Sequence, residues 1–98
     1  MSQASKDIAA LVRTGTLTLQ ARLAEAEESL ELYRWKVTMA RRSRNDAAGK
    51  FADLLETVCI PDLEAKESRL RAELEQYIGA GRDAMQEVAE LEAEGLVS

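Results

Sequence analysis

The sequence predicts an all-α protein, an antiparallel helical hairpin whose two long helices pack along a coiled-coil-like seam. Apolar residues recur at alternating spacings of three and four positions, which is typical of a helix that lies against other helices. Ala, Leu, Glu and Arg, which favour helices, are abundant, and the 98 residues include one Pro and five Gly. A chain of this length is expected to form one domain, residues 1–98.

The first expected element is a short N-terminal helix over residues 5–14. Ser5 is a favourable N-cap, and Asp7 lies in the first turn, where a carboxylate interacts well with the helix dipole. Gly15 lies between two Thr residues and weakens a helix by about 1 kcal/mol relative to Ala. We predict a break there. Because the seam crosses Gly15 in phase, a continuous helix is the alternative.

A long helix is expected over residues 16–59. The seam runs from Ala9 to Val58 without a change of phase, and Arg44 and Thr16 are its only positions that are not apolar. We interpret Arg44 as packing its aliphatic stem at the seam while its guanidinium stays in water. A role in specifying register or partner is the alternative. The seam positions after Arg44 are Ala47, Phe51, Leu54 and Val58.

Pro61 marks the predicted corner of the hairpin, at Cys59–Ile60. Proline lacks an amide donor and clashes with the preceding turn, so helices usually end before it. A second long helix over residues 61–94 is expected to follow, with its own apolar seam and with Gly95 at its end. A continuous helix kinked at Pro61 is the alternative.

Charge is unevenly distributed along the chain, whose net charge is −5. Residues 34–50 carry six basic side chains and one acidic one, whereas residues 51–98 carry four basic and twelve acidic ones. A corner at residue 60 places the basic segment opposite residues 71–87 and Arg44 beside Tyr77. Complementary charge favours this antiparallel register.

A second apolar stripe lies outside the seam. Leu32, Trp35 and Met39 have helical spacing, and Trp35 occupies the heptad position most remote from the seam. Ile78 and Met85 widen the seam of the facing helix at the predicted levels of residues 43 and 36. Because Trp and Met are typical interface anchors, we expect these five residues to form a partner-binding site. Scattered surface hydrophobicity is the alternative.

The sequence offers little for catalysis or for binding a cofactor or metal. It contains no His, the commonest general base and metal ligand, so its single cysteine, Cys59, has no His to activate it. Glu pairs along the helices are expected to be solvated helix faces rather than metal ligands. We therefore expect a protein that is not an enzyme and that has no cofactor, metal ion or small-molecule substrate.

The sequence also predicts a cytoplasmic protein without a membrane interaction. It contains no pattern of a signal peptide and no apolar run of membrane-spanning length, and one Cys cannot form an intrachain disulfide. In periodicity alone, the chain is similar to many short coiled-coil proteins of bacteria and phages.

The predicted function is non-catalytic protein binding, as an adaptor, assembly factor, chaperone or inhibitor. Two helices make a thin core, so a second copy of the chain is the first expected partner, in a homodimeric four-helix bundle, and another protein is the second. The alternative is a small nucleic-acid-binding regulator that uses residues 34–50, where Arg41, Arg42 and Arg44 form a basic cluster. The acidic net charge argues against this alternative.

Overall fold

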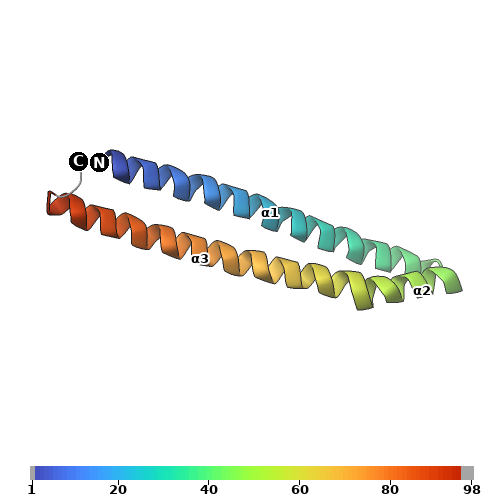
Figure 1. Cartoon of the computed structure of the whole chain (residues 1–98). Helices are drawn as coiled ribbons and strands as arrows, with labels where there is room; N and C mark the ends of the chain where they lie inside the picture. Colours follow the sequence, from blue (N-terminus) through green and yellow to red (C-terminus); the bar gives the residue numbers. More distant parts are fainter. Residues whose placement is uncertain (1, 96–98) are drawn as a thin grey trace. The chain divides into compact units, whose positions relative to one another are not determined.

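A computed structural model describes residues 2–95, almost all of them helical and none of them in a strand. Helix α1 spans Gln3–Arg42, α2 spans Asp46–Leu54, a π-helical segment, η1, spans Leu55–Cys59, and α3 spans Ile60–Ala93 (Figure 1). The prediction of an all-α helical hairpin is confirmed. Assembly of the hairpin into a four-helix bundle stays a prediction.

The described residues form two compact units. We call residues 22–70 the turn unit, and residues 2–21 together with 71–95 the terminal unit. In each unit, one segment of α1 packs against one segment of the returning chain, which comprises α2, η1 and α3. Each helix therefore has a single neighbour within its unit, which leaves most of its circumference exposed.

The chain reverses at residues 43–45, where a short turn joins α1 to α2 (Figure 1). The Ser43 hydroxyl donates to the carbonyl of Ala40 at 2.6 Å, which satisfies one of the open carbonyls at the end of α1. The next residue, Arg44, has a left-handed backbone with φ of 54°. The Asn45 side chain then caps α2 by accepting the amide hydrogens of residues 47 and 48.

The predicted corner at Cys59–Ile60 is therefore wrong, and so is the single helix over residues 16–59. The position of Arg44 gives a physical reason. A helix continued through residue 44 would carry this guanidinium into the apolar seam, whereas a turn there leaves the side chain exposed. The predicted pairing of Arg44 with Tyr77 is also wrong, because the register of the hairpin is set by the turn at residues 43–45.

Helical structure continues through Pro61, as in the alternative of a continuous helix kinked at this residue, but this helical stretch begins after the turn at residues 43–45. The π-helical segment η1 lies immediately before this proline. The amide of Ile60 donates to the carbonyl of Leu55, five residues earlier, instead of to a carbonyl four residues earlier. One π turn of this kind inserts a single extra residue into an α-helix.

The extra residue brings two apolar patterns into register. If the seam of α3 were extended toward the N-terminus in a regular α-helix, its positions would fall on Asp53 and Glu56, because seam positions recur every seven residues. These two side chains would then face α1. With the π turn, Ala52 and Leu55 face α1 and are buried, while Asp53 and Glu56 are exposed. The π turn thus avoids the burial of two carboxylates.

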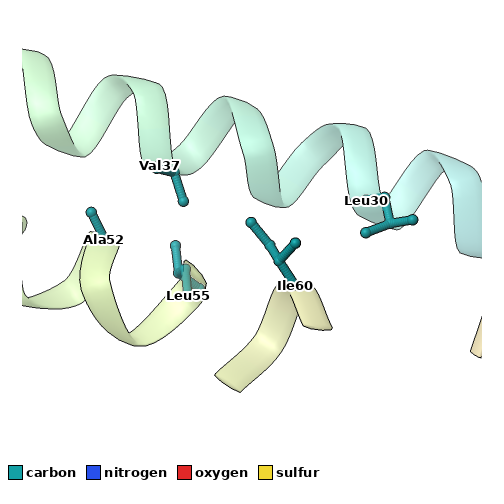
Figure 2. Close-up of a cluster of buried hydrophobic side chains, with 5 residues drawn as sticks. All are labelled: Leu30, Val37, Ala52, Leu55 and Ile60. Atoms are coloured by element: carbon teal, nitrogen blue, oxygen red, sulfur yellow. The ribbon is translucent and has the colours of Figure 1, made fainter. Parts of the chain in front are cut away.

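The core of the turn unit is a small cluster of buried apolar side chains. Leu30 and Val37 of α1 face Ala52, Leu55 and Ile60 of the returning chain (Figure 2). On the exposed flank of α1, Arg41 Nη2 lies 3.1 Å from an Asp53 carboxylate oxygen and 2.8 Å from one of Glu56. Arg34 lies 3.8 Å from Glu64.

These ion pairs replace the complementarity expected between residues 34–50 and 71–87. Arg34 and Arg41 of α1 are paired with acidic residues of α2, η1 and the first turns of α3. The charge argument for the predicted register is therefore wrong, although opposite charges do face each other along the hairpin.

The terminal unit is held by small residues and by hydrogen bonds between its two helices. The Tyr77 hydroxyl donates to the carbonyl of Leu11 at 2.5 Å. The Tyr77 ring occupies the space that a Cβ at Gly15 would need, and a Cβ at Gly81 would lie 2.6 Å from a methyl carbon of Val12. Both glycines thus permit close approach of α1 and α3.

The predicted N-terminal helix over residues 5–14 and its break at Gly15 are also wrong, because α1 runs unbroken from Gln3. Packing against Tyr77 explains why a glycine occurs inside this helix. Ser5 is not an N-cap: it is buried, and its hydroxyl donates to a carboxylate oxygen of Glu92 at 2.6 Å. Ser2 donates to the same carboxylate through its hydroxyl and its amide.

Glycines of α3 provide a matched test of this close packing. Gly81→Ala should lower the free energy of unfolding by about 1–3 kcal/mol, because the new methyl group overlaps Val12. Gly79→Ala should raise it by up to about 1 kcal/mol, because nothing beyond the helix's own nearby backbone lies within 4 Å of the new methyl group and Ala favours the helix. Denaturant unfolding of both variants measures the difference, and equal effects would contradict the packing of Val12 on Gly81.

The left-handed backbone of Arg44 predicts a stabilising substitution in the turn. Arg44→Gly should raise the free energy of unfolding by about 0.5–1 kcal/mol, because glycine adopts positive φ without a steric cost. Arg42→Gly, at a helical position two residues earlier, should lower it by a similar amount. Thermal or denaturant unfolding of the two variants compares them, and a loss of stability in Arg44→Gly would argue against this turn.

The pH dependence of stability should include a contribution from Glu92. Hydrogen bonds from Ser2 and then Ser5 lower the pKa of Glu92. Its contribution is therefore complete above the pKa of an unfolded glutamate, about 4.3, and is lost as the pH falls through the lower folded value. Thermal unfolding followed through this pH range should show a weaker dependence for Glu92→Gln than for the unmodified chain. An unchanged dependence would mean that Glu92 titrates alike in both states.

Candidate protein-binding surface

The packing of single helices leaves several large apolar side chains of the turn unit exposed. Each of five is at least half exposed to solvent, and they occur on both arms of this hairpin, namely Leu32, Trp35, Phe51, Leu54 and Val58. Scattered apolar residues are common on protein surfaces, but apolar side chains grouped on one helix face mark interaction sites. Helical spacing divides these five into two groups.

The first group is the outer α1 stripe, formed by Leu32 and Trp35 together with Met39. Their spacing of three and then four residues places them on one face of α1, directed away from the seam residues Leu30 and Val37. Leu32 and Trp35 are exposed, Trp35 by 58%, and Met39 is half-buried. A Trp side chain exposed to this extent is a favourable interface anchor because it carries a large apolar surface with few rotatable bonds.

Two further residues of the predicted site, Ile78 and Met85, belong to the terminal unit. Both are half-buried on α3. Their predicted levels beside residues 43 and 36 are wrong, because the neighbouring Tyr77 packs on Gly15. A role for Ile78 and Met85 in partner binding stays a prediction, but the register that grouped them with Trp35 no longer supports it.

The second group is the α2–η1 stripe, formed by Phe51, Leu54 and Val58. These residues are spaced by three and four positions and were expected in the seam. Instead, they are between 52% and 60% exposed. The face of α2 that packs on α1 carries smaller side chains, including Ala48 and Ala52. The face of α2 that carries the larger apolar side chains is thus directed to solvent rather than toward α1.

The sequence contained a signal for this exposed stripe that the seam analysis missed. The spacing of Phe51, Leu54 and Val58 is out of step with the later seam residues Leu63 and Leu70. Only one of the two patterns can face α1 in a continuous helix. The Ser-Arg-Asn sequence at residues 43–45 is the second missed signal, because Ser and Asn favour helix ends.

A hollow lies beside the α2–η1 stripe. We call it the Val58 hollow; its volume is about 310 Å³, and it is lined by Tyr33, Val58, Cys59, Asp62 and Leu63. Its wall is mostly apolar, with one carboxylate at the edge. The Lys36 ammonium lies 5.2 Å from the centre of the Tyr33 ring, where a cation interacts favourably with the aromatic face.

The residues of the predicted basic cluster, Arg41, Arg42 and Arg44, do not form a uniformly cationic surface. Hydrogen bonds to Glu56 and Asp53 raise the pKa of Arg41 and engage its guanidinium. Arg42 ends α1, Arg44 lies in the turn, and both are exposed. A second surface hollow near the turn is lined by cationic and anionic side chains together, namely Arg41, Arg44, Asp46, Lys50 and Asp53. The surface is therefore of mixed charge rather than uniformly cationic.

Neither a metal site nor a membrane span is found in the described part of the chain. Among residues 2–95, no three or more Cys, Asp or Glu side chains are grouped so that they could hold a metal ion. Within the same residues, no helix has an apolar stretch long enough to cross a membrane.

Comparison of the chain with protein-family models, curated proteins and solved structures finds no match. Function must therefore be inferred from the surface of the hairpin itself.

Proposed function

We propose that this chain is a non-catalytic protein-binding module that pairs with a second copy of itself and with another protein. The observation that carries the proposal is the exposure of five large apolar side chains on the turn unit, grouped in two stripes at helical spacing. Covering such stripes with another apolar surface is favourable by about 25 cal/mol for each Å² removed from water.

The thin core of the hairpin supports the same proposal. Each helix packs on one neighbour within its unit, and no large side chain is completely buried in the described part of the chain. A second layer of helices would supply the missing neighbours. This need favours an adaptor, assembly factor, chaperone or inhibitor, whose activity is the contact itself.

The outer α1 stripe is the proposed site for the other protein. Trp35 is its centre, flanked by Leu32 and Met39, and Leu32 and Trp35 are exposed to solvent. Partner helices read such a stripe through apolar side chains at spacings of three and four residues.

Nucleic-acid binding through residues 34–50 is less well supported by the surface. Arg41 is already engaged by Asp53 and Glu56, which lie next to it on α2 and η1. Phosphate binding there would have to displace these carboxylates or accept their repulsion. Binding to DNA or RNA that weakens steeply with salt would nevertheless favour this alternative over the proposed function.

The proposal predicts that Trp35 is required for partner capture. Proteins retained by the immobilised chain should be lost with Trp35→Ala and kept with Leu17→Ala, a matched control because Leu17 is similarly exposed in the terminal unit. Light scattering at tens of micromolar should give a mass above that of a 10.8 kDa monomer. Retention of the same proteins by all three chains would contradict the role of Trp35, and a monomeric mass would contradict self-association.

A further inference from the structure

We infer that two copies of the chain associate through the α2–η1 stripe, antiparallel and related by a two-fold axis that passes beside Leu54. This inference rests on the proposed self-association and adds its site and geometry. The stripe is distinct from the outer α1 stripe, so the other protein and the second copy would occupy different faces of the turn unit.

The stripe is self-complementary in the order of its side chains. Phe51, Leu54 and Val58 lie almost symmetrically about Leu54. In an antiparallel pair, Leu54 therefore meets the Leu54 of the second copy. At about 1.5 Å of rise per residue, Phe51 of one copy lies within about 2 Å of the level of Val58 of the other. A two-fold interface of this kind uses the same surface on both copies.

The Val58 hollow is positioned to receive the Phe51 ring. Phe51 is 52% exposed, and the hollow lies beside Val58, where the antiparallel arrangement brings the ring of the second copy. Its wall offers Tyr33 and Leu63 as apolar contacts, and its volume of about 310 Å³ admits an aromatic side chain. The pairing places one such anchor in a hollow on each copy, which is the arrangement typical of energetically dominant contacts.

Charge at the two ends of the stripe favours the antiparallel orientation. Lys50 precedes the stripe and Asp62 follows it, and both are exposed. Side chains of a helix lean toward its N-terminus, so in an antiparallel pair Lys50 and the partner's Asp62 lean toward each other. A parallel pair would instead place Lys50 beside the second Lys50. Attraction thus favours the antiparallel pair, and repulsion opposes the parallel pair.

Cysteine cross-linking tests the position of the axis. In a Cys59→Ser chain, Leu54→Cys should be joined to its second copy by a short bismaleimide, giving a covalent dimer of twice 10.8 kDa. Trp35→Cys is the matched control, because residues 35 and 54 are 58% and 59% exposed but lie on different stripes. Dimer formation by Trp35→Cys at the same rate as by Leu54→Cys would overturn the assigned surface.

A charge exchange tests the orientation without altering the apolar contacts. Lys50→Asp and Asp62→Lys should each raise the dissociation constant of the dimer by about tenfold, since either change brings like charges together. The double variant should restore most of the affinity. Circular dichroism checks that each variant is folded, and sedimentation measures the dissociation constant of its dimer. Failure of the double variant to recover would refute the antiparallel pairing.

The outcomes separate this inference from the function on which it rests. Leu54→Glu should dissociate the dimer while leaving capture of another protein through Trp35 intact. A dimer that survives Leu54→Glu but is lost with Trp35→Glu would overturn the α2–η1 interface and leave self-association standing. A monomer at every concentration would overturn both.

Discussion

The rest of the turn unit depends on one constraint: two apolar patterns that differ by one residue must share a single returning helix. Regular α-helix cannot present both the Ala52–Leu55 pair and the later Leu63–Leu70 pair to α1, because their spacing does not fit a seven-residue repeat. The π turn before Pro61 supplies the missing residue. It keeps Asp53 and Glu56 in water, where they meet Arg41, and it also determines that Phe51, Leu54 and Val58 point outward.

The terminal unit solves a different problem with small residues. Its helices approach closely enough that Gly15 and Gly81 occupy positions where a side chain would overlap Tyr77 or Val12. Close approach lets backbone and side-chain atoms meet at the seam, as the hydrogen bond from Tyr77 to the Leu11 carbonyl illustrates. One buried polar residue, Ser5, is satisfied by Glu92, so this unit buries a polar group without leaving it unpaired.

Periodicity predicted well which residues of each helix face its neighbour. The seam of α1 between Ala9 and Ala40 and that of α3 between Leu63 and Leu91 contain no exposed residue. The reversal of the chain was predicted poorly, because a heptad pattern states which face is buried and not where a helix ends. The predicted corner rests on Pro61, but a proline can be accommodated within a helix by a π turn, whereas a capped turn at residues 43–45 reverses the chain.

The candidate surface was predicted only in part for the same reason. Leu32 and Trp35 lie outside any seam, so their exposure follows from the helix period alone. Phe51, Leu54 and Val58 continue the heptad spacing of the α1 seam in the sequence. They do not continue it in the structure, because the turn at residues 43–45 separates them from α1. Their exposure depends on a three-residue turn and a π turn acting together, and the apolar pattern encodes neither.

The position of the turn also sets the order in which the hairpin can form. Contacts next to it join residues close in sequence, such as Arg41 and Asp53, which are 12 residues apart, whereas Ser5 and Glu92 are separated by 87. Closing the longer loop costs about 2 kcal/mol more in chain entropy than closing the shorter one. Folding is therefore expected to start at residues 43–45 and to proceed outward, each contact shortening the loop that the next must close.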